Sequence, residues 1–191
     1  YSMRICLVAS GLSERNRFLQ PWRYLLGTAC GLAERGYEVV LLTDRHSASG
    51  EGCLAGLPLL ACRGTRWPAH DPIRLARTLG AKAMLWHVGR TSLLAPSLLP
   101  RMPGEAPPLI GIWTCPLYRV SELLALGPGM LLRAPHLSAA HVLGLLVRDR
   151  AICDVLLAGQ PCGLVVECEH TRACLVERGV PGEQVHVVRP A

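Results

Sequence analysis

The feature that most constrains the fold is a strand–helix–strand unit at the start of the sequence. Met3–Ser10 is a short apolar run that ends in Ser-Gly, as a buried parallel strand does. Pro21 can open a helix, and apolar residues at helical spacing follow it as far as Gly36. Tyr37–Asp44 is a second apolar strand. Two strands joined by one helix run parallel in one sheet, so this unit predicts an α/β fold.

The alternation continues along the rest of the chain. Further strands are predicted at Leu57–Cys62, Ala83–Val88, Leu109–Thr114, Val155–Leu157, Leu164–Val166 and Val185–Val188. Helices are predicted at Pro72–Leu79, within Leu93–Pro108, at Ser121–Leu126 and Ser138–Cys153, and between Glu169 and Gly179, where Gly179 suits a left-handed helix end. No repeat or linker interrupts this order. The sequence therefore predicts one Rossmann-like domain over residues 1–191: a doubly wound, mostly parallel sheet with helices on both faces.

Composition excludes several classes of protein. Half of the 191 residues are hydrophobic and 18% are charged, which excludes a disordered chain. No uninterrupted apolar run reaches the ~18–20 residues that span a bilayer, and we expect no signal peptide. The nine cysteines form no Cys-x-x-Cys pair and many lie in apolar runs. We therefore expect reduced thiols in a cytoplasmic protein, with no metal site.

The net charge of +6 is carried almost wholly by arginine, because Lys82 is the only lysine. Arginine suits bidentate contacts with phosphate or carboxylate. The basic residues are scattered singly, with few aromatic residues beside them, so nucleic acid is not an expected partner.

In a doubly wound sheet, ligands bind beyond the carboxyl ends of the strands. The groups of residues that follow the predicted strands are polar, and each contains an arginine. They are Ser10, Arg15 and Arg17; Thr43-Asp44-Arg45; His87 and Arg90; Thr114, Tyr118 and Arg119; and Glu167–Arg172, which includes Glu169 and Arg172. Together they predict a cleft for an anionic or phosphorylated polyol. The competing interpretation is that loops are polar whatever they bind.

Several motifs are absent from the sequence. There is no Gly-x-Gly-x-x-Gly after the first strand and no Gly-x-x-x-x-Gly-Lys, so neither a dinucleotide site nor a P-loop is supported. There is also no Gly-x-Ser-x-Gly elbow and no His-Glu-x-x-His motif, which argues against two common classes of hydrolase.

Both ends of the chain carry a pattern of known enzymes. The pattern begins with a strand, followed by a helix that ends in Leu-Ala-x-x-Gly-His-Glu-Val. In this chain it is matched by Met3–Ser10 and then by Leu32-Ala33-Glu34-Arg35-Gly36-Tyr37-Glu38-Val39, in which Tyr37 replaces the histidine. Near the other end, Cys168-Glu169 stands where the pattern of these enzymes has Ser-Glu, and Gly179-Val180-Pro181 matches their Gly-Val-Pro. In these stretches the chain resembles glycosyltransferases of the two-domain GT-B architecture, especially the retaining family 4.

The resemblance implies that the chain is an N-terminal, acceptor-side domain. In that family a C-terminal domain holds the nucleotide-sugar donor, and this sequence stops at Arg189-Pro190-Ala191, where the family pattern continues. The expected partners are then a sugar or lipid-linked acceptor and the missing C-terminal domain. We expect the domain alone to hold no cofactor and to transfer no sugar. The rival interpretations are a stand-alone α/β ligand-binding or assembly module, and part of a GT-B sugar epimerase.

The resemblance also assigns roles to individual residues. The family often carries a catalytic-site histidine at the end of the fourth strand, which makes His87 the candidate; a structural histidine is the alternative, since a one-residue slip reverses the face. Glu169 is expected to cap the last helix, either alone or while also facing the cleft. Many relatives have a Gly-Gly turn where this chain has Gln20-Pro21-Trp22. Trp22 would prevent close backbone approach there and would shape an acceptor pocket instead.

One segment suggests contact with a membrane. Leu123–Leu132 is unusually apolar for a connection and is followed by Arg133. In relatives that glycosylate lipids, such surface meets the bilayer, so the resemblance implies peripheral contact with the cytoplasmic face. The alternatives are packing beneath the sheet and contact with the missing domain.

Overall fold

The computed structural model describes residues 2–44, 51–62, 70–88, 106–114, 117–125 and 163–189, together with Gly129 and Arg133. Within this part of the chain, one sheet contains eight strands in the order β3-β4-β2-β1-β5-β6-β7-β8. All neighbouring strands are parallel except β3 and β4. The predicted Rossmann-like α/β class, with a mostly parallel sheet, is therefore confirmed.

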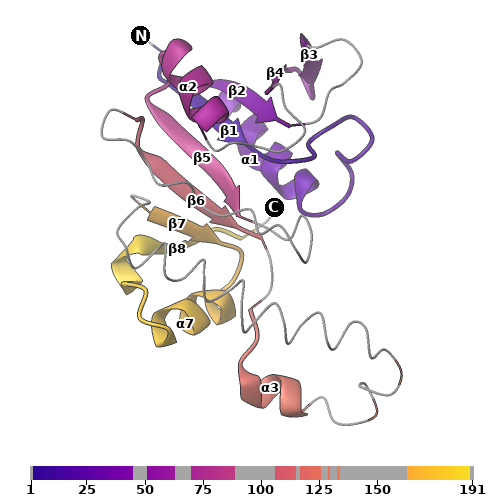
Figure 1. The fold of residues 1–191 in the computed structure, drawn as a ribbon, viewed down its shortest axis with the longest axis vertical. Helices are drawn as coiled ribbons and strands as arrows, with labels where there is room; N and C mark the ends of the chain where they lie inside the picture. Colours follow the sequence, from indigo (N-terminus) through magenta and orange to yellow (C-terminus); the bar gives the residue numbers. More distant parts are fainter. Residues whose placement is uncertain are drawn as a thin grey trace.

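The elements follow the alternation that the sequence predicts. The strands are β1 (Arg4–Val8), β2 (Glu38–Thr43), β3 (Glu51–Leu54), β4 (Leu57–Ala61), β5 (Ala83–Val88), β6 (Leu109–Trp113), β7 (Gly163–Val166) and β8 (Val185–Val187). The helices are α1 (Trp22–Glu34), α2 (His70–Thr78), α3 (Val120–Ala125), α7 (Glu169–Glu177) and the 3-10 turn η2 (Gly182–Gln184). Figure 1 shows the strands side by side, with α3 projecting beyond α7 and away from the sheet.

The two faces of the sheet are covered by different helices. One apolar core contains Leu25 and Ala29 of α1, packed against β1, β2 and β4. The other contains Ile73 of α2 and Leu175 of α7, packed against the opposite side chains of the same strands and of β5 to β8. Because alternate residues of a strand point to opposite faces, a strand buried on both faces is apolar throughout. This is why continuous apolar runs located the parallel strands.

The end of α7 was predicted correctly from the sequence, whereas the edge strand β3 was not predicted. Gly179, just beyond α7, has a φ of 93°, the left-handed conformation expected at this helix end. The edge strand β3 was missed. It pairs with β4 through a tight turn at Ala55 and Gly56, whose φ angles of 52° and 80° are those of a hairpin turn, but without its usual Asn-Gly sequence.

Some predictions lie outside the described residues. They are the helix at 138–153, the strand at 155–157 and nearly all of the helical stretch expected within 93–108. The apolar segment 123–132 is described only in part, through α3 and Gly129.

Candidate functional site at the carboxyl edge of the sheet

The order of the strands reverses direction between β1 and β5. From β1 the chain passes through α1 to β2 on one side, whereas β5, on the other side of β1, follows α2. The helices α1 and α2 lie on opposite faces of the sheet. Such a switch point leaves a crevice at the carboxyl ends of the two strands, which is where ligands bind in open α/β sheets.

His87 lies at this switch point. In β5, Leu85 belongs to the core under α1, whereas Trp86 and Val88 belong to the opposite core, so His87 faces α1. The pairing of Val8 with Trp86 places His87 next to the end of β1. Only 4% of the residue is exposed. His87 is therefore on the face that the β1–α1 connection covers, but it is not an open surface residue.

One hydrogen bond joins His87 to the next strand. Its Nε2 lies 2.7 Å from Oγ1 of Thr114, the residue directly after β6. The Nδ1 atom is buried and has no hydrogen-bond partner among the described residues. Burial lowers the pKa of His87 to about 4, so the ring is neutral at pH 7. A neutral imidazole has one donor and one acceptor nitrogen, so the pair can polarise the half-buried Thr114 hydroxyl but supplies no positive charge.

The loop between β1 and α1 is held closed by Asp44, the residue after β2. Its carboxylate accepts hydrogen bonds from Ser10 Oγ at 2.5 Å and from the Gly11 amide at 2.7 Å. The Trp22 indole Nε1 donates to the Ser10 carbonyl at 3.0 Å. The Asn16 amide donates to the Gly11 carbonyl at 2.8 Å. Hydrogen bonds with the side chains of Asp44, Trp22 and Asn16 therefore hold the turn in place.

The predicted arginines that the structure describes lie in three different segments, each with its own surroundings. Arg17 pairs with Glu14 at 2.8 Å and lies over the Phe18 ring, whereas Arg15 in the same loop is exposed. Arg172 donates to the Val185 carbonyl, which ties α7 to the start of β8. Arg90 lies outside the described residues.

Arg119 is held against α7 by two carboxylates. It bonds Glu177, the last residue of α7, at 2.6 and 2.8 Å, and Glu122 of α3 at 3.1 Å. Its bond lowers the pKa of the Glu177 carboxyl. Next to it, Arg178 donates to the Tyr118 carbonyl and the His170 ring contacts the Leu117 carbonyl. Residues 117–119 thus run along α7, with contacts both to its first turn and to its last residue.

Replacing Arg119 with glutamine is expected to lower the melting temperature slightly, because the side chain joins α3 to α7 at the surface. Saccharide binding at the edge formed by β5 and β6 should not change. Thermal unfolding and ligand titration of the same variant check this. Lost binding with an unchanged melting temperature would instead place Arg119 in the site.

Glu169 is not the helix cap that we expected. Cys168 occupies the N-cap position of α7, and Glu169 is the first residue of the helix. Its carboxylate is exposed and lies 3.6 Å from Nη1 of Arg172, one turn further on. A carboxylate in the first turn still interacts favourably with the helix dipole.

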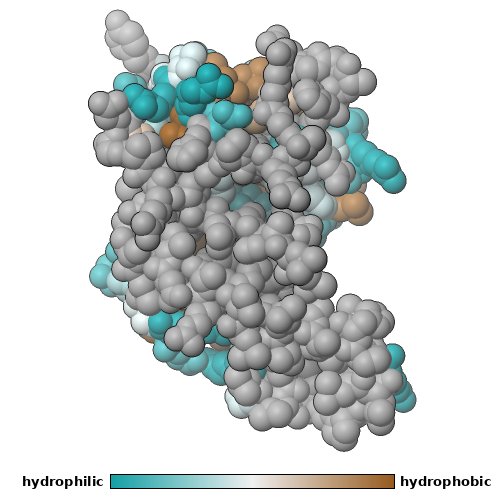
Figure 2. Space-filling view, in the orientation of Figure 1, coloured by the Kyte–Doolittle hydropathy of each residue, from teal (hydrophilic) through white to brown (hydrophobic). Residues whose placement is uncertain are grey.

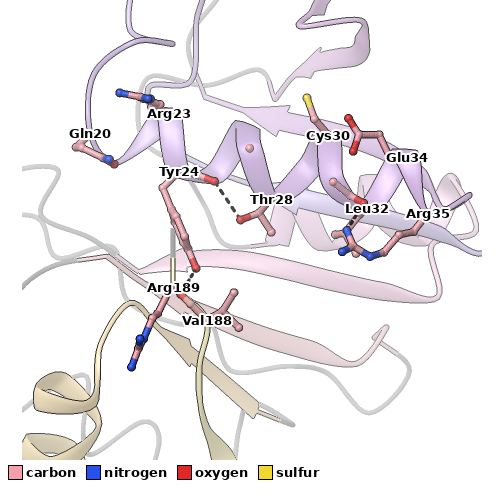
Figure 3. Close-up of a pocket in the computed structure, with 12 residues that line it drawn as sticks. Gln20, Arg23, Tyr24, Thr28, Cys30, Leu32, Glu34, Arg35, Val188 and Arg189 are labelled. Atoms are coloured by element: carbon pink, nitrogen blue, oxygen red, sulfur yellow. Dashed lines mark hydrogen bonds between the residues drawn. The ribbon is translucent and has the colours of Figure 1, made fainter. Parts of the chain in front are cut away.

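A groove of about 910 Å³ runs along the outer side of α1 and is separate from the switch point. Figure 3 shows Tyr24 pointing from α1 toward Val188 and Arg189 after β8, whereas Arg23 points away from them and Arg35 lies at the other end of the helix. The Tyr24 hydroxyl donates to the Val188 carbonyl at 3.1 Å. Neither His87 nor Thr114 is among its lining residues.

The described residues provide neither a metal centre nor a membrane-spanning helix. No group of three or more His, Cys, Asp or Glu side chains in these ranges is placed to hold a metal ion. None of the described helices combines the length and apolar character needed to cross a bilayer. On the face in Figure 2, much of the described surface is hydrophilic, with only small apolar areas.

Comparison with known proteins shows the fold. No protein family and no curated protein matches the sequence. Among solved structures, a glycosyltransferase from Rickettsia africae ESF-5 matches 98% of this chain and 43% of its own length, with a TM-score of 0.50 and 9% identity. A UDP-N-acetylglucosamine 2-epimerase from Rickettsia bellii matches 97% of this chain and 44% of its own, with a TM-score of 0.49 and 9% identity. The chain spans less than half the length of either protein. It has a Rossmann-like α/β fold that is also found in part of a glycosyltransferase.

Proposed function

We propose that this chain is the acceptor-side domain of a glycosyltransferase that takes its sugar from a nucleotide-sugar donor. The observation that carries the proposal is the His87–Thr114 pair at the switch point of a fold shared with part of a glycosyltransferase. The glycosyltransferase pattern at the two ends of the sequence adds support. The chain spans 43% of that neighbour, which leaves room for a donor-binding domain in the complete protein.

The proposed roles follow from exposure and charge. Thr114 is half-buried and its hydroxyl contacts the acceptor, whereas His87 is almost wholly buried and holds that hydroxyl in place. A neutral imidazole suits this role, because a sugar hydroxyl needs a hydrogen-bond partner and not a counter-ion. On the β1 side, the acceptor is proposed to lie against the turn in which Ser10 and Trp22 are held by hydrogen bonds. The proton of the acceptor leaves with help from the donor's phosphate, which the other domain holds.

The acceptor is proposed to be a sugar or a lipid-linked sugar. Phe18 and Leu19, in the β1–α1 loop, are 72% and 55% exposed. Arg15 and Arg17 stand next to them in the sequence. Apolar and basic side chains on one loop suit a lipid-linked acceptor at an anionic membrane surface, so we propose peripheral contact with the cytoplasmic face.

Binding of saccharides to this chain tests the proposed site. We expect neutral mono- and disaccharides to bind in the millimolar range by saturation-transfer NMR. Thr114→Val should weaken binding about tenfold, because the polarised hydroxyl is lost. The matched control is Thr78→Val, which removes a hydroxyl that bonds Arg74 within α2. Equal binding by both variants, or no binding by any saccharide, would favour an assembly module.

A further inference from the structure

The turn after β1 is the place where many Rossmann-like domains bind phosphate. There, free backbone amides and a helix start attract the anion, and a glycine allows close approach. In this chain the equivalent glycine is Gly11, whose φ of 73° is the left-handed conformation. The backbone geometry of the turn would thus permit an anion site. Whether an anion can bind there therefore depends on the side chains that contact the turn.

The amide that would bind phosphate is already bonded. The Gly11 N–H donates to Asp44 Oδ1 at 2.7 Å, while the other carboxylate oxygen accepts from Ser10 Oγ at 2.5 Å. Hydrogen bonds to a carboxylate are about twice as strong as those between neutral groups. A phosphate would have to displace the carboxylate and also overcome its like charge.

Trp22 also covers the turn. A Cβ atom built on Gly11 would lie 3.3 Å from Cζ2 of the indole, so the ring packs directly against this residue. The indole N–H fixes the ring by donating to the Ser10 carbonyl. Close approach of a ligand to the Gly11 backbone from this side is therefore blocked by a side chain that is itself held in place.

From these contacts we infer that Asp44 closes the turn after β1 to phosphate. The Asp44 carboxylate lies where the bound phosphate would otherwise accept a hydrogen bond from the Gly11 amide. Asp44 is a positioning residue: it acts through Ser10 and Gly11 and fixes the turn against which the acceptor is proposed to lie. Since the inference rests on the proposed function, it implies that an uncharged, hydroxyl-bearing acceptor group lies at this turn, with any donor or acceptor phosphate bound elsewhere.

Titration of the 191-residue chain with inorganic pyrophosphate, followed by the Gly11 amide signal in NMR spectra, tests the inference. We expect no shift of this signal in the wild type at millimolar pyrophosphate. In Asp44→Ala the amide is freed, so the signal should move and saturate, with affinity about tenfold or more above wild type. Asp44→Asn removes the charge but keeps an oxygen that can accept from the Gly11 amide, so it should show a smaller gain than alanine, which can be measured even if the alanine variant does not fold.

Asn16→Ala is the matched control. It removes the bond from Asn16 to the Gly11 carbonyl and so loosens the same turn, but it leaves Asp44 on the amide. A merely structural role for Asp44 predicts the same behaviour for all these variants, whereas the inference predicts pyrophosphate binding only when Asp44 is changed. Saturable shifts of Gly11 in the wild type, or no binding by any folded variant in which Asp44 is replaced, would overturn it. Neither result depends on sugar transfer, so the proposed function is tested separately.

Discussion

Replacing His87 with alanine is expected to lower sugar transfer by the complete enzyme by about a hundredfold or more. The domain should remain folded. His87 holds the Thr114 hydroxyl at 2.7 Å, and without the ring this hydroxyl is free to rotate. A reacting group displaced by about 1 Å can cost a hundredfold in rate, since the near-attack geometry is lost. The measurement is kcat and KM for transfer, with far-UV circular dichroism on the same protein.

A second variant separates positioning from simple loss of packing. His87→Gln retains a side-chain amide that can reach a hydrogen-bond partner, and we expect it to recover part of kcat while KM changes little. Met84→Ala, in the same strand but on the opposite face, is the packing control. Near-wild-type turnover in His87→Ala would remove His87 from the mechanism.

The free energy of unfolding is expected to fall by about 3 kcal/mol between pH 7 and pH 4 because of His87 alone. Burial lowers its pKa in the folded state to about 4, from 6.5 in the unfolded chain. Between these values the unfolded chain binds a proton that the folded domain does not. Stability from this group is therefore complete above pH 6.5 and is lost progressively as the pH falls to 4.

Urea unfolding at several pH values between 7 and 4 measures this effect. Carboxylates such as Glu122 and Glu177, whose pKa values are lowered by Arg119, also lose stability in acid. The informative quantity is therefore the difference between wild type and His87→Gln, which cannot bind the proton. We expect the two profiles to diverge below pH 6.5. Parallel profiles would show that His87 is not buried as a neutral ring.

The sequence was most informative where burial on both faces dictates the residues. A parallel strand with a core on each side has to be apolar throughout, so the limits of β5 at Ala83 and Val88 could be read directly. The edge strand β3 has no such pattern, since Glu51, Gly52 and Cys53 precede the buried residue Leu54. Its turn at Ala55 and Gly56 has no strong turn sequence, so the hairpin was not predicted.

The positions of the candidate site residues in the fold could be predicted in part. Strand ends identified Ser10, His87 and Thr114, because the carboxyl ends of parallel strands meet at one edge. Arg119 was placed there by the same reasoning, but its position depends on how residues 117–119 run along α7 and on Glu177, which is distant in sequence. The burial of His87 is likewise a property of the assembled layers and has no signature in neighbouring residues.

Turnover of nucleotide sugars tests the account most directly. A protein that continues past Ala191 with the sequence encoded downstream is incubated with a panel of nucleotide-sugar donors and saccharide or lipid-linked acceptors. We expect transfer from one donor, no transfer by residues 1–191 alone, and loss of transfer in the longer His87→Ala variant. A stop codon directly after Ala191, or no transfer and no donor hydrolysis across the panel, would contradict the account.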